Sequence, residues 1–313
     1  MSGQKRAIII DTDPGQDDAV AIWLALAASA QLDVLAVTTV AGNVPLAQST
    51  TNALRLCDAA GVAMTRIHAG ADRPLLVPLE TAEFVCGPDG LDGAVELPEP
   101  RRAPDAGHAA QAIIDIVRRA GAGEVTICAL GPLTNIALAF RLAPDILPKI
   151  REVALMGGAM DLGNITPAAE FNIYVDPHAA GVVFTAGVPI TMFGLHVTHD
   201  VIASPQEIAA IAALGTQTSK SVVGMMTRRR AGGLGTAEHP LHDPCVIAHL
   251  LWGDLFAGRD CFVEVETSSG ALRGRTTIDW NGRLQKTPNA RVINQVDAPA
   301  FFNRLTGMLA KLP

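Results

Sequence analysis

The sequence of 313 residues contains few aromatic and few charged residues: 4% are Phe, Trp or Tyr, and 18% are Asp, Glu, Lys or Arg. Acidic residues outnumber Lys and Arg by 31 to 24, which gives a formal net charge of −7, and the only basic run is Arg228-Arg229-Arg230. Proteins that hold a nucleic-acid polymer by its phosphates need a basic surface. The composition therefore argues against such a partner and favours a small neutral or cationic ligand, or an acidic site that binds a metal.

Long apolar runs and paired cysteines are also missing. The longest nearly apolar stretch, residues 19–30, is shorter than the ~18 residues that a membrane helix needs, so no membrane span is expected. Only residues 7–10 are apolar before Asp11, which is too short for the core of a signal peptide. The five cysteines are scattered without a C-x-x-C pair, which predicts buried reduced thiols in place of a disulfide framework or a zinc ribbon. We therefore expect a cytoplasmic protein.

Short β-branched runs alternate with longer amphipathic segments along most of the chain. The short runs, interpreted as buried strands, are residues 7–10, 32–40, 125–130, 153–156 and 189–193. The amphipathic segments predict helices over residues 17–30, 45–60, 107–120, 133–142 and 177–186. A strand followed by a helix of this length implies a right-handed crossover, so we expect an open, mostly parallel α/β sheet with helices on both faces. In such sheets ligands bind at the carboxyl ends of the strands.

The C-terminal third has a different pattern, with extra helices and a small antiparallel hairpin that would give the sheet a mixed edge. The expected elements are helices at 205–214, 218–230 and 242–252, a hairpin of 261–266 and 273–280, a strand at 291–295 and a closing helix from Asp297. Residues 70–105 lack sustained periodicity, and a loop of that length in a compact domain is usually functional or mobile. No linker divides the chain, so we expect one domain over residues 1–313.

Four carboxylates lie within eight positions directly after the first predicted strand: Asp11, Asp13, Asp17 and Asp18. Asp17 and Asp18 could simply complement the dipole of the following helix, and Asp13 could cap it. Capping needs only one of them, however, and each close pair near a surface repels by roughly 1–4 kcal/mol. A divalent cation resolves this conflict, and carboxylates without nearby Cys or His favour calcium or magnesium over zinc.

A further acidic residue, Asp243, follows His242 and precedes a proline at the start of a predicted helix. It is either an N-cap ahead of the proline or a functional carboxylate. Asp176 shows the same pattern beside His178, so local grounds do not decide between the two interpretations. His242 could titrate near neutrality and act as an acid, although a lone histidine is more often structural.

Glu170 and Asn172 lie in a loop beyond another predicted strand. If residues 170–172 are extended, these two side chains point the same way and Phe171 points the other way. Two hydrogen-bonding side chains on one face suit a hydroxyl-rich ligand such as a sugar, although Asn-rich loops often satisfy their own backbone. The glycines at 42 and 157–158 are consistent with close backbone approach or with ordinary turns.

Several motifs occur in an order that resembles the inosine-uridine-preferring nucleoside hydrolase family. They are Asp-Thr-Asp-Pro-Gly-Gln-Asp-Asp-Ala at 11–19, Val-Ala-Gly-Asn at 40–43, Leu-Gly-Pro-Leu-Thr-Asn at 130–135, Met-Gly-Gly at 156–158, Asn164 with Ala-Glu-Phe-Asn at 169–172, and His-Asp-Pro at 242–244. The resemblance runs from residue 7 to at least residue 245, and residues 286–289 also resemble the family's late segment. The first motif is highly specific, and the others corroborate it.

The resemblance implies calcium-dependent hydrolysis of the N-glycosidic bond of ribonucleosides (pyrimidine nucleosides, inosine or both) to ribose and free base, by a homotetramer or homodimer. Calcium would be held by Asp13, Asp18, the backbone carbonyl of Leu130, and Asp243. The ribose hydroxyls would be bound by Asp17, Asn43, Met156, Asn164, Glu170 and Asn172. Asp13 would also take a proton from the water that the metal activates, and His242 would protonate the departing base. The carboxylates would stabilise the oxocarbenium-like state.

Two segments depart from the family pattern. Many members with a pyrimidine or broad preference have a histidine in the long loop, where this chain has Cys86. A thiol with a pKa near ~8.5 is a poorer substitute for imidazole at neutral pH, so leaving-group activation would rest on His242 alone. The family's lid corresponds to residues 227–238, which are rich in Arg and Gly and contain no aromatic residue. The nucleobase contacts therefore stay unassigned.

Two alternatives remain at the level of sequence. Asp11-Thr12-Asp13 resembles the haloacid-dehalogenase-type phosphatases, in which Asp11 would be the nucleophile, Asp13 the acid and magnesium the metal. That family favours Thr or Val where this chain has Gly15, and no later paired-Asp motif of the expected kind is present. The other alternative is a non-catalytic protein that binds calcium or a sugar on the same scaffold. Ribose release from uridine, cytidine and inosine with calcium present would distinguish it from an enzyme.

Overall fold

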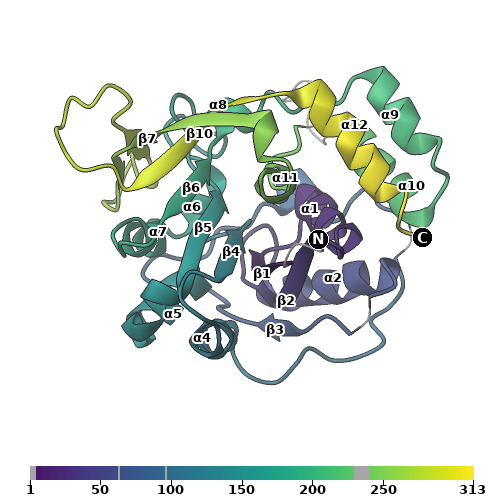
Figure 1. Ribbon diagram of the computed structural model, residues 1–313, viewed down its shortest axis with the longest axis horizontal. Coiled ribbons are helices and arrows are strands. Elements are labelled where there is room, and N and C mark those ends of the chain that lie inside the picture. Colours follow the sequence, from purple (N-terminus) through teal and green to yellow (C-terminus); the bar gives the residue numbers. More distant parts are fainter. Residues whose placement is uncertain (1–4, 63, 96, 229–239) are drawn as a thin grey trace.

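A mostly parallel sheet forms the centre of the protein (Figure 1). The computed structural model describes residues 5–62, 64–95, 97–228 and 240–313. Within these residues the sheet has eight strands in the order β3-β2-β1-β4-β5-β6-β10-β7. The strands are β1 Arg6–Thr12, β2 Leu32–Thr39, β3 Ile67–Ala69, β4 Val125–Ala129, β5 Ile150–Met156, β6 Ile190–Phe193, β7 Phe256–Cys261 and β10 Ala290–Val296. A separate antiparallel pair joins β8 (Val263–Val265) and β9 (Thr276–Ile278).

The strand order reverses at β1, which pairs in parallel with β2 on one side and with β4 on the other. The chain runs outward through β2 and β3 and then returns to β4, β5 and β6. At such a reversal the loops that follow the two central strands diverge and leave a crevice at the carboxyl ends of the strands. The crevice therefore lies beyond Thr12 of β1 and Ala129 of β4. Farther along the sheet, β10 is parallel to β6, and the edge strand β7 is antiparallel to β10.

Helices cover both faces of the sheet (Figure 1). One apolar cluster includes residues of α1 (Gln16–Ala27), α2 (Leu46–Ala59), α9 (Pro205–Ala212), α10 (Gln217–Thr227), α11 (Pro244–Leu251) and α12 (Ala298–Leu309). A second includes residues of α4 (Ala109–Arg119), α5 (Thr134–Leu142) and α7 (Pro177–Phe184). Strand β1 contributes to both, because Ile8 and Ile10 belong to the first cluster and Ile9 to the second. All three side chains are fully buried, as expected for a central strand covered on both sides.

The predicted fold class is confirmed, since the sheet is mostly parallel and the C-terminal third adds helices and the β8–β9 hairpin. The predicted strands and helices correspond to observed elements whose ends differ by a few residues. Two strands were not predicted. β3 has only three residues, and the edge strand β7 contains the exposed residues Arg259 and Asp260, which hide its strand pattern. The predicted helix at 218–230 ends at Thr227, and residues 229–230 lie outside the described residues.

The long segment over residues 70–105 is irregular, as expected, apart from the short helix α3 (Glu83–Cys86). Side chains of neighbouring helices anchor it along its length. The amide of Asn135 accepts a hydrogen bond from the backbone N–H of Ala71 at 2.8 Å, and Asn52 donates to the carbonyl of Asp89 at 2.7 Å. Because its polar backbone is held in this way, the segment can form a defined wall beside the crevice.

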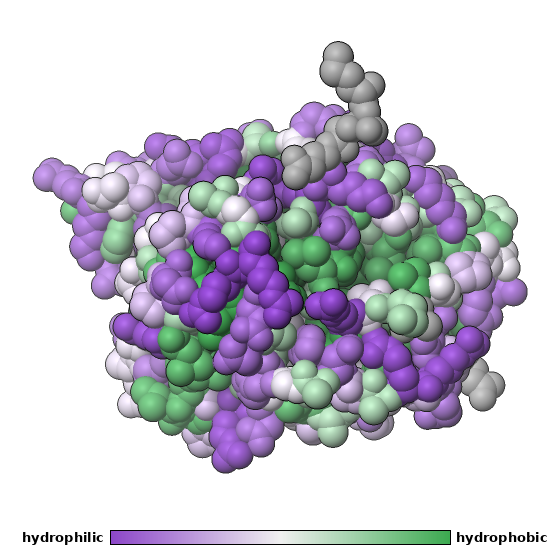
Figure 2. Space-filling model, turned by 60° about the horizontal axis from the view of Figure 1, so that its bottom comes forward, coloured by the Kyte–Doolittle hydropathy of each residue, from purple (hydrophilic) through white to green (hydrophobic). Residues whose placement is uncertain are grey.

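The surface and the cysteines agree with the composition. On the face shown in Figure 2, hydrophilic residues project outward and hydrophobic ones gather in the recesses between them. No helix among the described residues has both the length and the apolar character needed to cross a bilayer. All five cysteines are free and buried, which confirms the prediction of reduced thiols.

Candidate active site

The Asp13 carboxylate lies beyond β1, between the turns that follow β2 and β4. A Cβ atom at Gly42 or at Gly131 would collide with Asp13, so both turns need glycine to close around it. The backbone N–H of Asn43 donates to Oδ2 of Asp13 at 2.6 Å. The other oxygen, Oδ1, is buried and has no hydrogen-bond partner among the described residues. Asp13 is therefore held by one oxygen and keeps the second unpartnered inside the protein.

Asp17, Asp18 and Asp243 bring carboxylates together from opposite ends of the chain. One oxygen from each lies within 4.8 Å of the other two. Burial raises the pKa of Asp18 to about 6. Burial, followed by the charges of Asp17 and Asp18, raises the pKa of Asp243 well above its ordinary value, and burial with the charge of Asp18 does the same for Asp13. The ionised carboxylates thus repel one another in a site shielded from water.

The side chains of Asp13 and Asp243 do not make the helix-capping bonds that their positions in the sequence would allow. Helix α1 begins only at Gln16, so Asp13 lies before its first turn. Asp243 makes no side-chain capping bond to α11. Asp176, in the same Asp-Pro sequence, does cap α7 by accepting the backbone N–H of Ala179 at 3.0 Å. The structure therefore separates a capping aspartate from a site aspartate where local sequence could not.

The donors of this cluster fit a hard divalent cation. Its side-chain ligands are carboxylate oxygens, with no Cys or His among them, which favours calcium or magnesium. The cavity beside it is lined by no Lys or Arg among the described residues. A bound cation would relieve their repulsion. Asp17, which was predicted to bind ribose, belongs to this cluster, whereas Asp13, which was predicted as a metal ligand, does not. The structure thus has an acidic cluster that could bind a metal.

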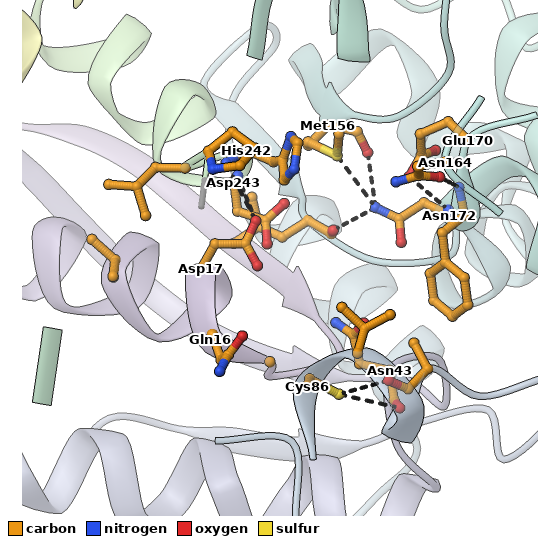
Figure 3. A pocket seen from close by; sticks show the side chains of 18 of the residues that line it. Gln16, Asp17, Asn43, Cys86, Met156, Asn164, Glu170, Asn172, His242 and Asp243 are labelled. Carbon is orange, nitrogen blue, oxygen red and sulfur yellow. Dashed lines mark hydrogen bonds between the residues drawn. The ribbon is translucent and has the colours of Figure 1, made fainter. Parts of the chain in front are cut away.

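A cavity of about 430 Å³ opens beside the carboxylates (Figure 3). Every side chain predicted to bind ribose lines it: Asp17, Asn43, Met156, Asn164, Glu170 and Asn172. His242, Asp243 and Leu130 also line it. The two remaining predicted metal ligands, Asp13 and Asp18, are fully buried and do not contribute to the lining. The fold therefore places the predicted ribose residues around one space with the acidic cluster at its edge.

Glu170 and Asn172 reach this cavity from a helix, so the extended conformation considered for residues 170–172 is wrong. Glu170 is the N-cap of α6 (Phe171–Val175), where its carboxylate accepts the backbone N–H of Asn172 at 2.9 Å and that of Ile173 at 3.2 Å. It also accepts the N–H of Gly158 at 2.9 Å. Burial raises the pKa of Glu170 to about 7, although these bonds lower it. The short helix thereby fixes both side chains.

His242 lies at the same rim, next to Asp17 and Asp243 (Figure 3). Its Nδ1 lies 2.7 Å from the hydroxyl oxygen of Thr198, which is fully buried in the short helix α8 (Leu195–Thr198). The ring of His199 packs edge-on against that of His242, with centroids 5.4 Å apart. These contacts fix the orientation of the imidazole, and the backbone N–H of His242 donates to Asp17 at 3.3 Å.

Sequence reasoning missed several residues of the lining, among them Gln16, Phe84, Val85, His199, Met225 and Met226. Phe84 is the most informative, because it is two-thirds exposed beside the cavity. An aromatic residue was sought only in the lid at 227–238, of which residues 229–238 lie outside the described residues. The sole Phe of the irregular segment 70–105 was the signal that could have identified it.

Known proteins share both the sequence and the fold. The sequence profile of the family described as "Inosine-uridine preferring nucleoside hydrolase" matches residues 8–303. The chain belongs to this family. It is 44% identical to an uncharacterized protein of Schizosaccharomyces pombe over 98% of this chain and 99% of the relative. It is 40% identical to the pyrimidine-specific ribonucleoside hydrolase RihB of Escherichia coli O157:H7, over 96% of this chain and 95% of the relative.

Solved nucleoside hydrolase structures have the same architecture. The purine-preferring ribonucleoside hydrolase from Gardnerella vaginalis is 31% identical and superposes with a TM-score of 0.87, covering 97% of this chain and 98% of that one. As a nucleoside hydrolase, the chain is a glycosidase-type enzyme. Its relatives include one named for pyrimidines and one named for purines. Family membership therefore does not by itself assign the base.

The nucleoside hydrolase cavity contains Cys86 at the end of α3. Its thiol lies 3.2 Å from the carbonyl oxygen of Ala82, to which it donates, and the side chain is buried. Burial, followed by the charge of Asp13, raises the pKa of this thiol to about 12. A thiol that weakly acidic does not release its proton to a departing base at neutral pH. Cys86 therefore contributes a buried, weakly acidic thiol to the cavity wall.

Proposed function

We propose that this enzyme catalyses calcium-dependent hydrolysis of the N-glycosidic bond of pyrimidine ribonucleosides, inosine or both, to ribose and free base. The observation that carries the proposal is one cavity with two kinds of wall. Buried carboxylates that need a cation lie on one side, and the hydrogen-bonding side chains of α6 and its neighbours lie on the other. A hydroxyl-rich sugar beside a metal fits that arrangement.

Calcium would be held by Asp13, Asp18, the carbonyl of Leu130, and Asp243. All four supply oxygen, the ligand type that calcium prefers. When bound, the metal would supply the positive charge that lowers the pKa of a water molecule and orients it. The carbonyl of Leu130 already accepts a hydrogen bond from Asn172 at 2.8 Å, and its second lone pair stays available.

Asp13 is the base that takes the proton from the attacking water. Its Oδ2 is fixed by the N–H of Asn43, whereas its Oδ1 has no donor among the described residues and can accept that proton. The position of Asp13 between Gly42 and Gly131 leaves its carboxylate little room to rotate. Orientation of this kind lowers the entropic part of the barrier.

The ribose is bound by Asp17, Asn43, Met156, Asn164, Glu170 and Asn172. Glu170 and Asn164 are held by backbone bonds at the start of α6, so they are preorganised for the sugar hydroxyls. Negative charge from Asp17 and its neighbours stabilises the positive charge that develops on the sugar as the bond to the base breaks. His242, oriented by Thr198, donates a proton or a hydrogen bond to the departing base.

A phosphatase with Asp11 as nucleophile fits the structure less well. Asp11 is fully buried and does not line the cavity. Its Oδ1 accepts hydrogen bonds from the hydroxyl of Thr38 at 2.5 Å and from the amide of Asn135 at 2.9 Å. Its Oδ2, like Oδ1 of Asp13, is buried without a partner among the described residues, so the match to the nucleoside hydrolase family is what argues most strongly against a phosphatase.

The test is ribose release from a panel of uridine, cytidine, inosine, adenosine and guanosine by the purified protein with calcium. We expect hydrolysis of at least one nucleoside, loss of activity after chelation, and recovery when calcium is restored. Where a site aspartate is replaced by asparagine, the exposed Asp72→Asn variant is the matched control. Absence of ribose from every nucleoside would overturn the proposal and favour a binding protein. We further propose that the enzyme works in the cytoplasm as a single-domain homodimer or homotetramer.

A further inference from the structure

Asp92, in the long segment 70–105, is joined to three parts of the structure. Its backbone carbonyl accepts the side-chain amide of Gln16 at 2.5 Å, its backbone N–H donates to the carbonyl of Cys86 at 3.2 Å, and its carboxylate forms an ion pair with Arg228. Gln16 opens α1, Cys86 ends α3 and Arg228 directly follows α10. We call Gln16, Asp92 and Arg228 the clamp.

Arg228 holds the segment at a second point. Its guanidinium also donates to the backbone carbonyl of Val85 at 3.1 Å. Val85 and Asp92, both in the segment 70–105, therefore share the planar guanidinium of a residue distant in sequence, a geometry that a lysine could not reproduce. The Arg228 side chain is only 18% exposed, so its charge is partly shielded from water. Its bonds consequently count for more than those of a fully exposed pair.

Glycines allow the backbone to pack closely at the clamp. A Cβ atom at Gly93 would lie 2.6 Å from the carbonyl oxygen of Gly224 in α10. A Cβ atom at Gly87 would lie 2.5 Å from the Cβ atom of Asp92. Gly87 also has a φ of +88°, a backbone conformation that favours glycine. The segment is thus seated directly on α10 and folded tightly around Asp92.

The clamp holds the part of the cavity wall that is mostly apolar. Phe84, Val85 and Cys86 of α3 and Met225 and Met226 of α10 all line the cavity. The side chains assigned to ribose come mainly from other elements, namely the start of α1, the end of β5 and α6. A planar nucleobase suits the apolar wall, whereas the sugar suits the polar one.

We propose that Arg228 is a positioning residue that sets nucleobase binding by fixing α3 against α1 and α10 through Asp92 and Val85. The inference rests on the proposed function, because it assigns the α3–α10 wall to the base of a nucleoside. Arg228 acts through backbone and carboxylate contacts and does not touch the reacting atoms.

The experiment compares Arg228→Met, Asp92→Asn and the double variant with Arg118→Met. Arg118 pairs with Asp145 far from the cavity, with both side chains about half exposed, and is the matched control. The first measurement is hydrogen exchange of peptides covering residues 82–93 without substrate. The second is kcat and KM for the best nucleoside, together with inhibition by free ribose.

We expect hydrogen exchange at residues 82–93 to be faster in both single clamp variants than in the unaltered enzyme. In the Arg118→Met control the exchange rate should not change. The KM should rise by about fivefold, with kcat and ribose inhibition nearly unchanged, and the double variant should add little. Unchanged exchange in Arg228→Met, or equal losses in nucleoside and ribose binding, would overturn the proposal. If the unaltered enzyme hydrolyses no nucleoside, the proposed function fails, while the exchange data still decide whether the clamp exists.

Discussion

The side-chain amide of Asn172 donates to the backbone carbonyl of Leu130 at 2.8 Å and to that of Met156 at 3.2 Å. One side chain of α6 thus ties together the ends of β4 and β5, and it joins a proposed calcium ligand to the proposed ribose wall. Asn172→Ala would leave two buried carbonyls without this donor. We expect kcat/KM to fall at least about thirtyfold, in line with ~2 kcal/mol for such a loss. Weaker calcium binding in the same variant, measured by titration, should accompany it; unchanged calcium affinity would refute the link.

Asp13→Asn tests the assigned base. The amide keeps an acceptor for the N–H of Asn43 but cannot take a proton, so we expect kcat to fall by about 10³-fold or more. Circular dichroism should remain native, and the calcium-free melting temperature should not decrease, because one member of a repelling cluster has lost its charge. Near-normal turnover would exclude Asp13 as the base.

His242→Ala tests protonation of the leaving group. We expect a much larger loss of kcat on natural nucleosides than on a ribosyl substrate whose leaving group needs no proton. Thr198→Val should show the same selectivity at smaller amplitude, because it removes the hydroxyl that orients the ring. Equal losses on both substrates would argue for a purely structural histidine.

Calcium should stabilise the fold. Binding relieves the repulsion among Asp17, Asp18 and Asp243, and a ligand at about a hundred times its Kd contributes roughly 2.7 kcal/mol. We expect thermal unfolding to shift upward with calcium and less with magnesium, and Asp243→Asn to remove most of the shift. An equal shift in that variant would place the metal elsewhere.

Glu170 predicts a pH dependence of the calcium-free protein. Its pKa is raised from 4.5 to about 7, so the folded state binds the proton more tightly than the unfolded state. Its contribution to stability is therefore complete below about pH 4.5 and is lost as the pH rises toward 7. Glu170→Gln should flatten the fall in the free energy of unfolding over this range by up to ~3 kcal/mol. Urea unfolding at a series of pH values measures this, and an unaltered profile would contradict it.

Local sequence patterns predicted the strands and helices whose apolar residues recur at regular spacing. The run around Ile9 could be identified as a strand because it is short, apolar and followed by turn residues, and the carboxylates after it marked the carboxyl end of the sheet. Residues whose role depends on distant partners could not be assigned in this way. Nothing near Asp243 distinguishes it from the capping Asp176, and the ion pair of Asp92 with Arg228 joins segments far apart in the chain. Glu170 lines the cavity with an extended backbone, but the helix that begins directly after it was not predicted, because a capping side chain of α6 looks like part of a polar loop.

The two walls of the cavity differ in how tightly they are packed, which has an evolutionary consequence. The carboxylates lie at strand ends that are packed so closely that even a methyl group at Gly42 or Gly131 would collide. This wall of the cavity can therefore tolerate little substitution. By contrast, the wall made by α3 and the end of α10 is held in place by a few side-chain contacts with the irregular segment 70–105. Substitutions in this wall can change which nucleobase is preferred while the catalytic carboxylates stay the same. Substrate specificity can therefore diverge during evolution without a change in the chemistry of bond cleavage.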